Sequence, residues 1–322
     1  MALGRIYLQS GAMLNLMQDQ DASVLRGNNN AISNLKNIRE AAAGYHFNKW
    51  YGVNIEVGIL PSFIGTESYN TQENWCYQRA MISEFTPYYF SGARLQVFPS
   101  KNFKTELWLV NGWQSYNAWN NRLGIGNSNY YRPNENTQLV ANFYVGKDNK
   151  IGSTRFHHDN SISYRYKHTS KGLISQAAVC LNTHYGVEGK NNVIGAALSH
   201  RLWFKNNKLA WTLRVDALKN KGAYLAIAPC TQEINPYNIA LSAMNTPSLN
   251  VGQLTSTFDI MPNDFYTLRV EYAYRKSNVP YFAGRGGTTS PDGWQNTPVV
   301  GNWMPDLQKN NHSIRVAVNF RL

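Results

Sequence analysis

The chain ends with the stretch Ser313-Ile314-Arg315-Val316-Ala317-Val318-Asn319-Phe320-Arg321-Leu322. Side chains of an extended strand alternate between two faces, so one face of this stretch is entirely apolar and the other carries polar residues and alanine. A terminal strand with an open edge promotes aggregation unless another strand pairs with it. We therefore predict that residues 313–322 pair with the alternating first segment, 5–16, and close a transmembrane β-barrel whose apolar face meets lipid.

The composition of the 322-residue chain is compatible with a membrane barrel. Hydrophobic residues make up 43% of the chain and the mean hydropathy is −0.44. No apolar run approaches the roughly 18 residues that a membrane-spanning helix needs. Barrel strands direct every second residue to an aqueous lumen, so low mean hydropathy is expected for them. Aromatic residues make up 13% of the chain, which suits the aromatic girdles at membrane interfaces. A soluble, tyrosine-rich β-sandwich or solenoid has the same composition and remains the alternative.

The spacing of the alternating segments is the strongest evidence for the fold. We count roughly fourteen of them, at residues 5–16, 35–46, 51–59, 89–98, 103–111, 122–132, 138–146, 159–167, 173–182, 193–204, 209–217, 253–260, 265–275 and 313–322. Their connectors alternate between short and long throughout the chain, with 218–252 and 276–311 as the two longest. Outer-membrane barrels combine short periplasmic turns with long outer loops. We therefore predict an all-β fold with a single domain over 1–322, a closed antiparallel transmembrane β-barrel of roughly fourteen strands.

Arginine dominates the residues that lie opposite the apolar faces. The predicted pore-lining residues are Arg94, Gln96, Arg165, Arg201, Arg214, Asp216, Arg269, Glu271, Arg315 and Arg321. Rings of basic side chains lower the barrier for anions, so we expect a water-filled pore for small hydrophilic solutes with a mild anion preference. An equally weighted interpretation is that these arginines pair with acidic neighbours, such as Arg214 with Asp216 across strands or Arg269 with Glu271, and stiffen the wall.

The long connector 61–87 is the candidate constriction loop. A barrel of this size has an interior too wide for wall side chains to fill, so another segment must narrow it. If the loop folds inward, it places opposed charges and an aromatic ring at a constriction, from Glu67, Trp75, Arg79 and Glu84. An outward loop is the alternative. The connector 276–311 is a second candidate plug or lid, with Tyr281, Phe282, Arg285, Trp294 and Trp303 among its glycines and prolines.

Several other functions are disfavoured by the sequence. The formal net charge is +12, but the basic residues are scattered singly rather than clustered as in nucleic-acid-binding proteins. Three distant cysteines do not form a disulfide framework or a zinc site. His157-His158-Asp159 is the one conspicuous cluster, and adjacent strand residues point to opposite faces, so the two histidines do not readily share a metal or a triad. We therefore expect no catalytic residues, no metal site and no cofactor.

Short motifs along the chain resemble those of the OmpL-like β-barrel porins of outer membranes. They are Gly65-Thr66-Glu67-Ser68, Asn74-Trp75, the segment Tyr88 to Gly92 after Pro87, and Asn111-Gly112-Trp113. The resemblance extends over nearly the whole chain and implies a diffusion channel in the outer membrane of a Gram-negative bacterium. The expected partners are outer-membrane lipid, lipopolysaccharide and small hydrophilic or anionic solutes, with homo-oligomerisation left open.

Two features of the chain ends bear on this expectation. Met1-Ala2-Leu3-Gly4 lacks the charged and apolar regions of a signal peptide. If the protein is exported, this numbering therefore describes a mature or trimmed chain. The last residue is Leu322, whereas barrels of this class usually end on an aromatic residue. The alternative function is a non-channel barrel or soluble β-sandwich that binds a ligand or glycan through its long loops. Conductance in a lipid bilayer separates the two.

Overall fold

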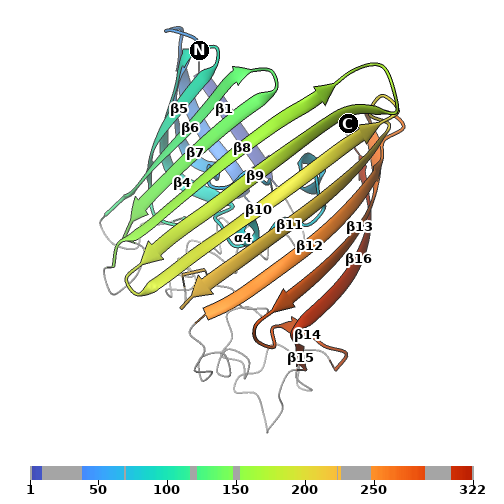
Figure 1. The fold of residues 1–322 in the computed structure, drawn as a ribbon. Helices are drawn as coiled ribbons and strands as arrows, with labels where there is room; N and C mark the ends of the chain where they lie inside the picture. Colours follow the sequence, from blue (N-terminus) through green and yellow to red (C-terminus); the bar gives the residue numbers. More distant parts are fainter. Residues whose placement is uncertain are drawn as a thin grey trace.

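The computed structural model describes residues 2–8, 38–68, 70–116, 122–147, 153–222, 224–225, 248–286 and 306–320, with side chains from residue 40 onward. Fourteen strands of these ranges form one antiparallel sheet in which strands adjacent in the chain are paired. They are β1 (Ala2–Leu8), β2 (Ile38–Phe47), β3 (Val53–Pro61), β4 (Tyr89–Ser100), β5 (Phe103–Val110), β6 (Gly124–Asn134), β7 (Thr137–Gly146), β8 (Arg155–His168), β9 (Ile174–Glu188), β10 (Asn191–Phe204), β11 (Leu209–Lys221), β12 (Ser248–Ile260), β13 (Tyr266–Ser277) and β16 (Asn310–Phe320). Each predicted segment overlaps one of these strands (Figure 1), and the first, 5–16, overlaps β1 over residues 5–8, so the all-β class is confirmed.

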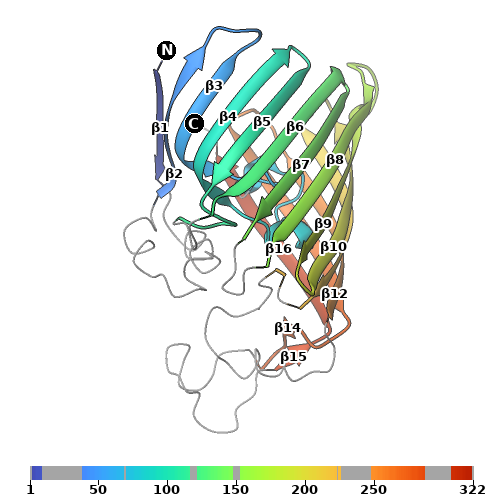
Figure 2. The same ribbon diagram turned by 90° about the vertical axis from the view of Figure 1, so that its left-hand side faces the viewer.

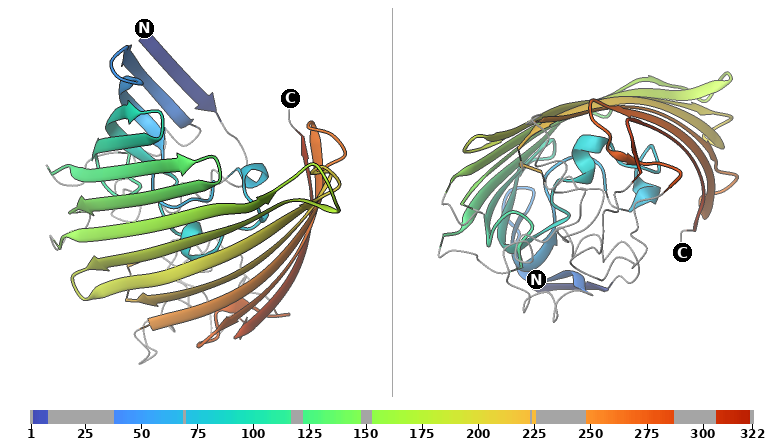
Figure 3. Two further views of the ribbon diagram at one scale, coloured as in Figure 1. Left: turned by 45° about the horizontal axis from the view of Figure 1, so that its top comes forward. Right: turned by 90° about the horizontal axis from the view of Figure 1, so that it is seen from below.

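The sheet curves around an inner space but is open between its first and last strands. Figure 2 shows β1 to β8 side by side in chain order, and Figure 3 shows the curvature from two further directions. Among the described residues β1 pairs only with β2, and β16 pairs only with β13. The predicted pairing of 313–322 with 5–16 is therefore not part of this sheet. Residues 9–16 of that predicted first strand lie outside the described ranges.

Short turns gather at one end of the sheet, and both chain ends lie at that same end (Figure 1). The opposite end carries the long connectors, with one exception that the sequence did not predict. There β9 continues to Glu188, and only Gly189 and Lys190 separate it from β10. Gly189 adopts a φ of +59°, the left-handed backbone region that a two-residue hairpin turn requires. The expected alternation of connector lengths is thus wrong at this hairpin.

The two longest connectors are shorter than predicted because the strands on either side extend further. β11 reaches Lys221 and β12 begins at Ser248, while β13 reaches Ser277 and β16 begins at Asn310. Within the second of these connectors, β14 (Phe282–Ala283) pairs with β15 (Leu307–Gln308) as a small separate sheet. Trp294 and Trp303 lie outside the described residues.

The outer face of the sheet is apolar and exposed. On β16, the side chains of Ile314, Val316, Val318 and Phe320 point outward and are between 52% and 76% exposed. Residues 311, 313, 315, 317 and 319 alternate with them and are partly buried. The described helices include none with the length and apolar character needed to cross a membrane. The alternation in the terminal stretch thus separates an apolar outer face from a polar inner face, as predicted.

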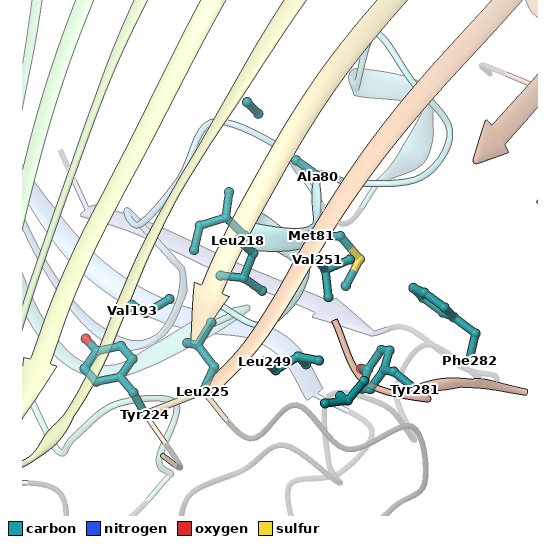
Figure 4. Packing of buried hydrophobic residues seen from close by; sticks show 13 residues of the cluster. Ala80, Met81, Val193, Leu218, Tyr224, Leu225, Leu249, Val251, Tyr281 and Phe282 are labelled. Carbon is teal, nitrogen blue, oxygen red and sulfur yellow. The ribbon is translucent and has the colours of Figure 1, made fainter. Parts of the chain in front are cut away.

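The connector between β3 and β4 lies inside the curve of the sheet (Figure 3). It contains a 3-10 turn, Thr71–Glu73, and one short helix, α4 (Met81–Glu84). Met81 and Ile82 are buried against Val193, Leu218 and other apolar residues of the inner wall (Figure 4). Burying each side chain contributes about 1.5–3 kcal/mol. Ordering the connector costs about 1–2 kcal/mol per residue, so polar contacts must also hold it in place.

Candidate functional site

A row of buried arginines on the inner wall holds the connector 61–87, and Arg214 on β11 is its centre. Arg214 is fully enclosed, with 1% of its surface exposed. Its Nη1 donates to Glu67 Oε1 at 2.7 Å and to the carbonyl oxygen of Gln78 at 2.7 Å, both on the loop. Its Nε donates to Asp216 Oδ2 on the same strand at 3.1 Å. One guanidinium therefore joins the wall to two points of the loop.

Arg201 on β10 and Arg269 on β13 repeat this arrangement and share Asp259 on β12. Arg201 Nη2 lies 2.7 Å from Asp259 Oδ2, and Arg269 Nε lies 2.6 Å from Asp259 Oδ1. Arg201 also donates to the Trp75 carbonyl oxygen at 3.0 Å, and Arg269 to the Thr71 carbonyl oxygen at 2.8 Å. Each arginine thus hydrogen-bonds both a buried wall carboxylate and a backbone carbonyl oxygen of the partly buried loop.

Wall carboxylates accept the backbone N–H groups of the same loop. Glu271 on β13 accepts from the N–H groups of Tyr77 at 2.6 Å and Gln78 at 3.0 Å. Asp216 accepts from the N–H group of Met81 at 2.9 Å. Hydrogen bonds to charged groups contribute about 1.5–3 kcal/mol each. These polar contacts therefore add the stabilising free energy that docking of the loop requires beyond apolar burial.

The charges of this network balance. Four arginines face four carboxylates, namely Arg201, Arg214, Arg269 and Arg315 against Glu67, Asp216, Asp259 and Glu271. Arg315 is the peripheral member, because its side chain is 28% exposed and its Nη1 lies 3.9 Å from Glu271 Oε1. For the three central arginines, the structure therefore matches the interpretation in which they pair with acidic groups.

The partners differ from those predicted. Arg214 and Asp216 do interact, but both belong to β11, two residues apart, rather than to neighbouring strands. Arg269 pairs with Asp259 and not with Glu271, because Asp259 is its direct neighbour in the register of β12 and β13. Glu271 instead receives the loop N–H groups described above. The loop and the register between neighbouring strands therefore provide the partners Glu67 and Asp259, which the sequence did not predict.

The other predicted wall residues lie apart from this network. Arg94 pairs with Glu56 on the adjacent strand. Gln96 accepts from Asn54 Nδ2 at 2.8 Å and donates to Glu106 Oε1 at 2.6 Å. These three additional side chains, Asn54, Glu56 and Glu106, extend the polar inner face across β3 and β5.

The two remaining predicted wall residues are Arg165 and Arg321. Arg165 is half-buried and donates from Nε to Asn136 Oδ1 at 2.9 Å. Arg321 is outside the described residues. Arg165 has no carboxylate partner in the part of the chain that the structure describes, which distinguishes it from the arginines under the loop.

The predicted loop residues do not form one set of opposed charges. Glu67 is used to hold Arg214, and Trp75 packs edge-on against Trp203 of β10 with ring centroids 5.7 Å apart. Arg79 is buried, and its guanidinium lies 4.9 Å from the ring centroid of Tyr88. Glu84 lies at the end of α4, with its Oε1 3.4 Å from the hydroxyl oxygen of Tyr88. Burial raises the pKa of Tyr88, so this hydroxyl stays neutral.

A protein-family model described as "Putative beta-barrel porin-2, OmpL-like" matches residues 2–302. The chain belongs to this family. The predicted resemblance is therefore confirmed, and the chain is a porin of the bacterial outer membrane. A site whose ion pairs hold a loop is also consistent with a family of channels rather than of enzymes.

Solved structures place the same fold among outer-membrane porins. The anion-selective porin from Comamonas acidovorans is 11% identical, with 88% of this chain and 77% of that chain covered and a TM-score of 0.51. The trimer form of OmpT, an outer membrane protein of Vibrio cholerae, is 10% identical, with 88% and 81% covered and a TM-score of 0.48. A search among curated protein sequences gave no match. At these identities the similarity concerns the fold alone.

This OmpL-like porin also has an inner-wall cluster in which His157 and Asp159 were noted from the sequence but the third member, His184, was missed. His157 and Asp159 point inward from β8, and His184 lies opposite Asp159 in the register of β8 and β9. The neighbouring His158 points the other way and stacks on Phe143, as expected for adjacent strand residues. The available signal was the two-residue spacing of His157 and Asp159 combined with a histidine on the next strand.

Proposed function

We propose that the chain is a passive diffusion channel for small hydrophilic solutes, narrowed by the connector 61–87 and mildly selective for anions. Pairing of the terminal segments 5–16 and 313–322 closes the barrel, with its apolar outer face in contact with lipid. The observation that carries the proposal is the attachment of this connector to the inner wall through Arg201, Arg214 and Arg269. A loop held by buried ion pairs narrows the interior without filling it.

Anion preference requires cationic side chains that are not neutralised. The network under the loop is balanced, so its arginines contribute little to selectivity. A cavity of about 760 Å³ lies at the end of the sheet with short turns, and Trp75 of the loop is among its lining residues. The charged side chains that line it are Lys101, Arg132 and Arg165 against the single carboxylate of Glu135. This excess of positive charge attracts anions to the mouth of the channel.

Two further arginines add positive charge within the loop region. Arg79 Nη2 donates to the Thr86 hydroxyl oxygen at 3.3 Å, and Arg275 Nη2 donates to Gln78 Oε1. Neither guanidinium has a carboxylate partner within 4.0 Å among the described residues. We infer that the field inside the channel is positive in spite of the balanced network.

Planar-bilayer recording tests the proposal directly. Purified, folded protein should give discrete conductance steps in KCl, and a salt gradient should give a reversal potential on the chloride side. Absence of steps above a protein-free control would overturn the channel function, and a reversal potential on the potassium side would overturn the selectivity. The variant Lys101→Gln/Arg132→Gln/Arg165→Gln should move the reversal potential toward potassium. Unchanged selectivity would show that these side chains do not face the permeation path.

A further inference from the structure

The inner wall of β8 and β9 carries three buried side chains with metal-ligand chemistry. His157, Asp159 and His184 are 0%, 0% and 2% exposed. One ligand atom from each residue lies within 4.8 Å of those of the other two. The two imidazoles approach most closely, with His157 Nε2 3.1 Å from His184 Nδ1. Their hydrogen-bond partners determine which nitrogen of each ring carries the proton.

Tyr224 contacts His157 on the side away from His184. The hydroxyl group of Tyr224 donates to the carbonyl oxygen of Phe156 at 3.1 Å. The same hydroxyl group lies 2.8 Å from His157 Nδ1, and it accepts from Nδ1–H when its own proton is directed at the Phe156 carbonyl oxygen. In that tautomer of the neutral ring, His157 Nε2 is bare and faces His184.

Asn182 fixes the proton on the far side of His184. Asn182 Nδ2 donates to the carbonyl oxygen of Asn160 at 3.0 Å, which sets the orientation of the amide. Its Oδ1 therefore faces His184 Nε2 at 2.7 Å and accepts the Nε2–H proton. A neutral His184 then has a bare Nδ1, and this atom faces the bare Nε2 of His157.

With His157 protonated on Nδ1, two lone pairs face each other across 3.1 Å, an arrangement that a bound cation stabilises. The third residue, Asp159, lacks a hydrogen-bond donor at one of its oxygens among the described residues. Asp159 Oδ2 accepts from the Gly65 N–H group at 3.2 Å and from Asn142 Nδ2 at 2.9 Å. The buried Oδ1 has no hydrogen-bond partner among the described residues. A cation among the three residues satisfies all of these atoms at once.

We propose that His157, Asp159 and His184 bind a divalent transition-metal ion of the zinc type. Two imidazoles and one carboxylate are a zinc donor set, whereas Mg²⁺ and Ca²⁺ favour oxygen ligands alone. Tetrahedral zinc with bonds of about 2.0–2.1 Å places neighbouring ligand atoms about 3.3 Å apart, close to the 3.1 Å between the imidazole nitrogens. Tyr224 and Asn182 act as the outer partners that orient metal-bound histidines.

The metal would tie the wall to the constriction loop. The three ligands come from two adjacent strands, and Asp159 also holds the backbone of Gly65 at the start of the loop. The nearby Arg155 stacks on the ring of Tyr224 at 4.5 Å, and its charge is offset by Glu188 at 2.7 Å. The site is therefore structural and stands independently of what permeates the channel.

Calorimetric titration of the chelator-treated, detergent-folded protein with Zn²⁺ tests the proposal. We expect one ion per chain, and at least about tenfold weaker binding in His157→Gln, His184→Gln and Tyr224→Phe. His158→Gln, on the opposite face of the same strand, should bind as the parent does. Absence of stoichiometric binding to the parent would overturn the proposal and indicate a proton shared between the rings. Undiminished binding in the double variant His157→Gln/His184→Gln would also overturn it.

A measurement on the parent protein does not depend on how well the variants fold. Zn²⁺ should raise the unfolding temperature of the parent relative to chelator, since an ion that binds only the folded state stabilises it. Mg²⁺ at the same concentration should have no effect. An equal rise with both ions would overturn the assignment to the zinc class.

Discussion

The arginines beneath the loop and those at the end with short turns occupy the same inner face but have different surroundings. Arg214 is enclosed by Glu67, Asp216 and a loop carbonyl group, whereas Arg165 is half-buried and bonded to the neutral Asn136. The alternation of strand residues assigns both to the lumen. The connector 61–87 separates the two: it contacts Arg214, whereas Arg165 lines the cavity at the end with short turns.

Replacing Arg214 by Met should have the largest effect. The change leaves Asp216 buried and Glu67 partly buried without their cation, which costs about 3–5 kcal/mol of unfolding free energy. The loosened loop should also raise the single-channel conductance. Urea unfolding in detergent and bilayer recording measure the two effects. Arg165→Met is the matched control, with an expected loss below about 1 kcal/mol. Equal losses in both variants would remove the distinction between the two groups of arginines.

Glu271→Gln should have an intermediate effect. The amide keeps the shape of the side chain but loses the charge that receives the N–H groups of Tyr77 and Gln78. We expect a loss of about 1.5–3 kcal/mol, the usual contribution of hydrogen bonds to a charged group, together with larger current fluctuations from a mobile loop. Glu135→Gln, at an exposed turn, is the control and should match the parent in both measurements. A Glu271→Gln channel with the current fluctuations and unfolding free energy of the parent would contradict the anchoring role of this carboxylate.

Cys76 reports whether the loop is docked. Burial raises the pKa of its thiol to about 11, so the group is neutral at pH 8 and reacts slowly with maleimide. In a Cys180→Ser/Cys230→Ser background, labelling should accelerate about tenfold per pH unit up to that pKa, because the thiolate is the reactive form. Adding Arg214→Met should raise the rate at pH 8 at least about tenfold. A slower rate would mean that the loop stays docked, since Arg214 lowers the thiol pKa in place.

The smallest predicted effect separates the two groups of arginines by selectivity alone. Arg165→Gln should shift the reversal potential slightly toward potassium and change the unfolding free energy by less than about 1 kcal/mol. Arg201→Gln, whose guanidinium is neutralised by Asp259, should leave the reversal potential unchanged at the cost of stability. Recordings in the same salt gradient compare the two. Equal shifts would mean that both guanidinium groups sense the permeating ions.

The strand positions could be predicted because each strand alternates and each short turn has its own chemistry. In the turn after β10, Lys205, Asn206 and Asn207 all adopt positive φ, which asparagine tolerates well. The extension of β9 was missed because Thr183 interrupts the apolar outer face after Leu181. Local polarity therefore predicted where strands exist more reliably than where they end.

The inner face of the site could also be predicted, but its partners could not. Arg214 was assigned to the lumen from its position in β11, yet its partner Glu67 is 147 residues away in the chain. Strand periodicity contains no information about where a loop folds back. The same holds for His157 and His184, which come together only when β8 and β9 are placed in register.

The sheet pairs each strand with its neighbour in the chain, so hairpins can be added one after another as the barrel forms. The contacts of the loop 61–87 with the wall form later than the hairpins. Tyr77 and Gln78 precede β4, but their carboxylate partner Glu271 belongs to β13 and is more than 190 residues away. The loop 61–87 therefore cannot dock on Glu271 until β13 has joined the sheet. Substitutions in the anchoring network should accordingly speed unfolding far more than they slow folding.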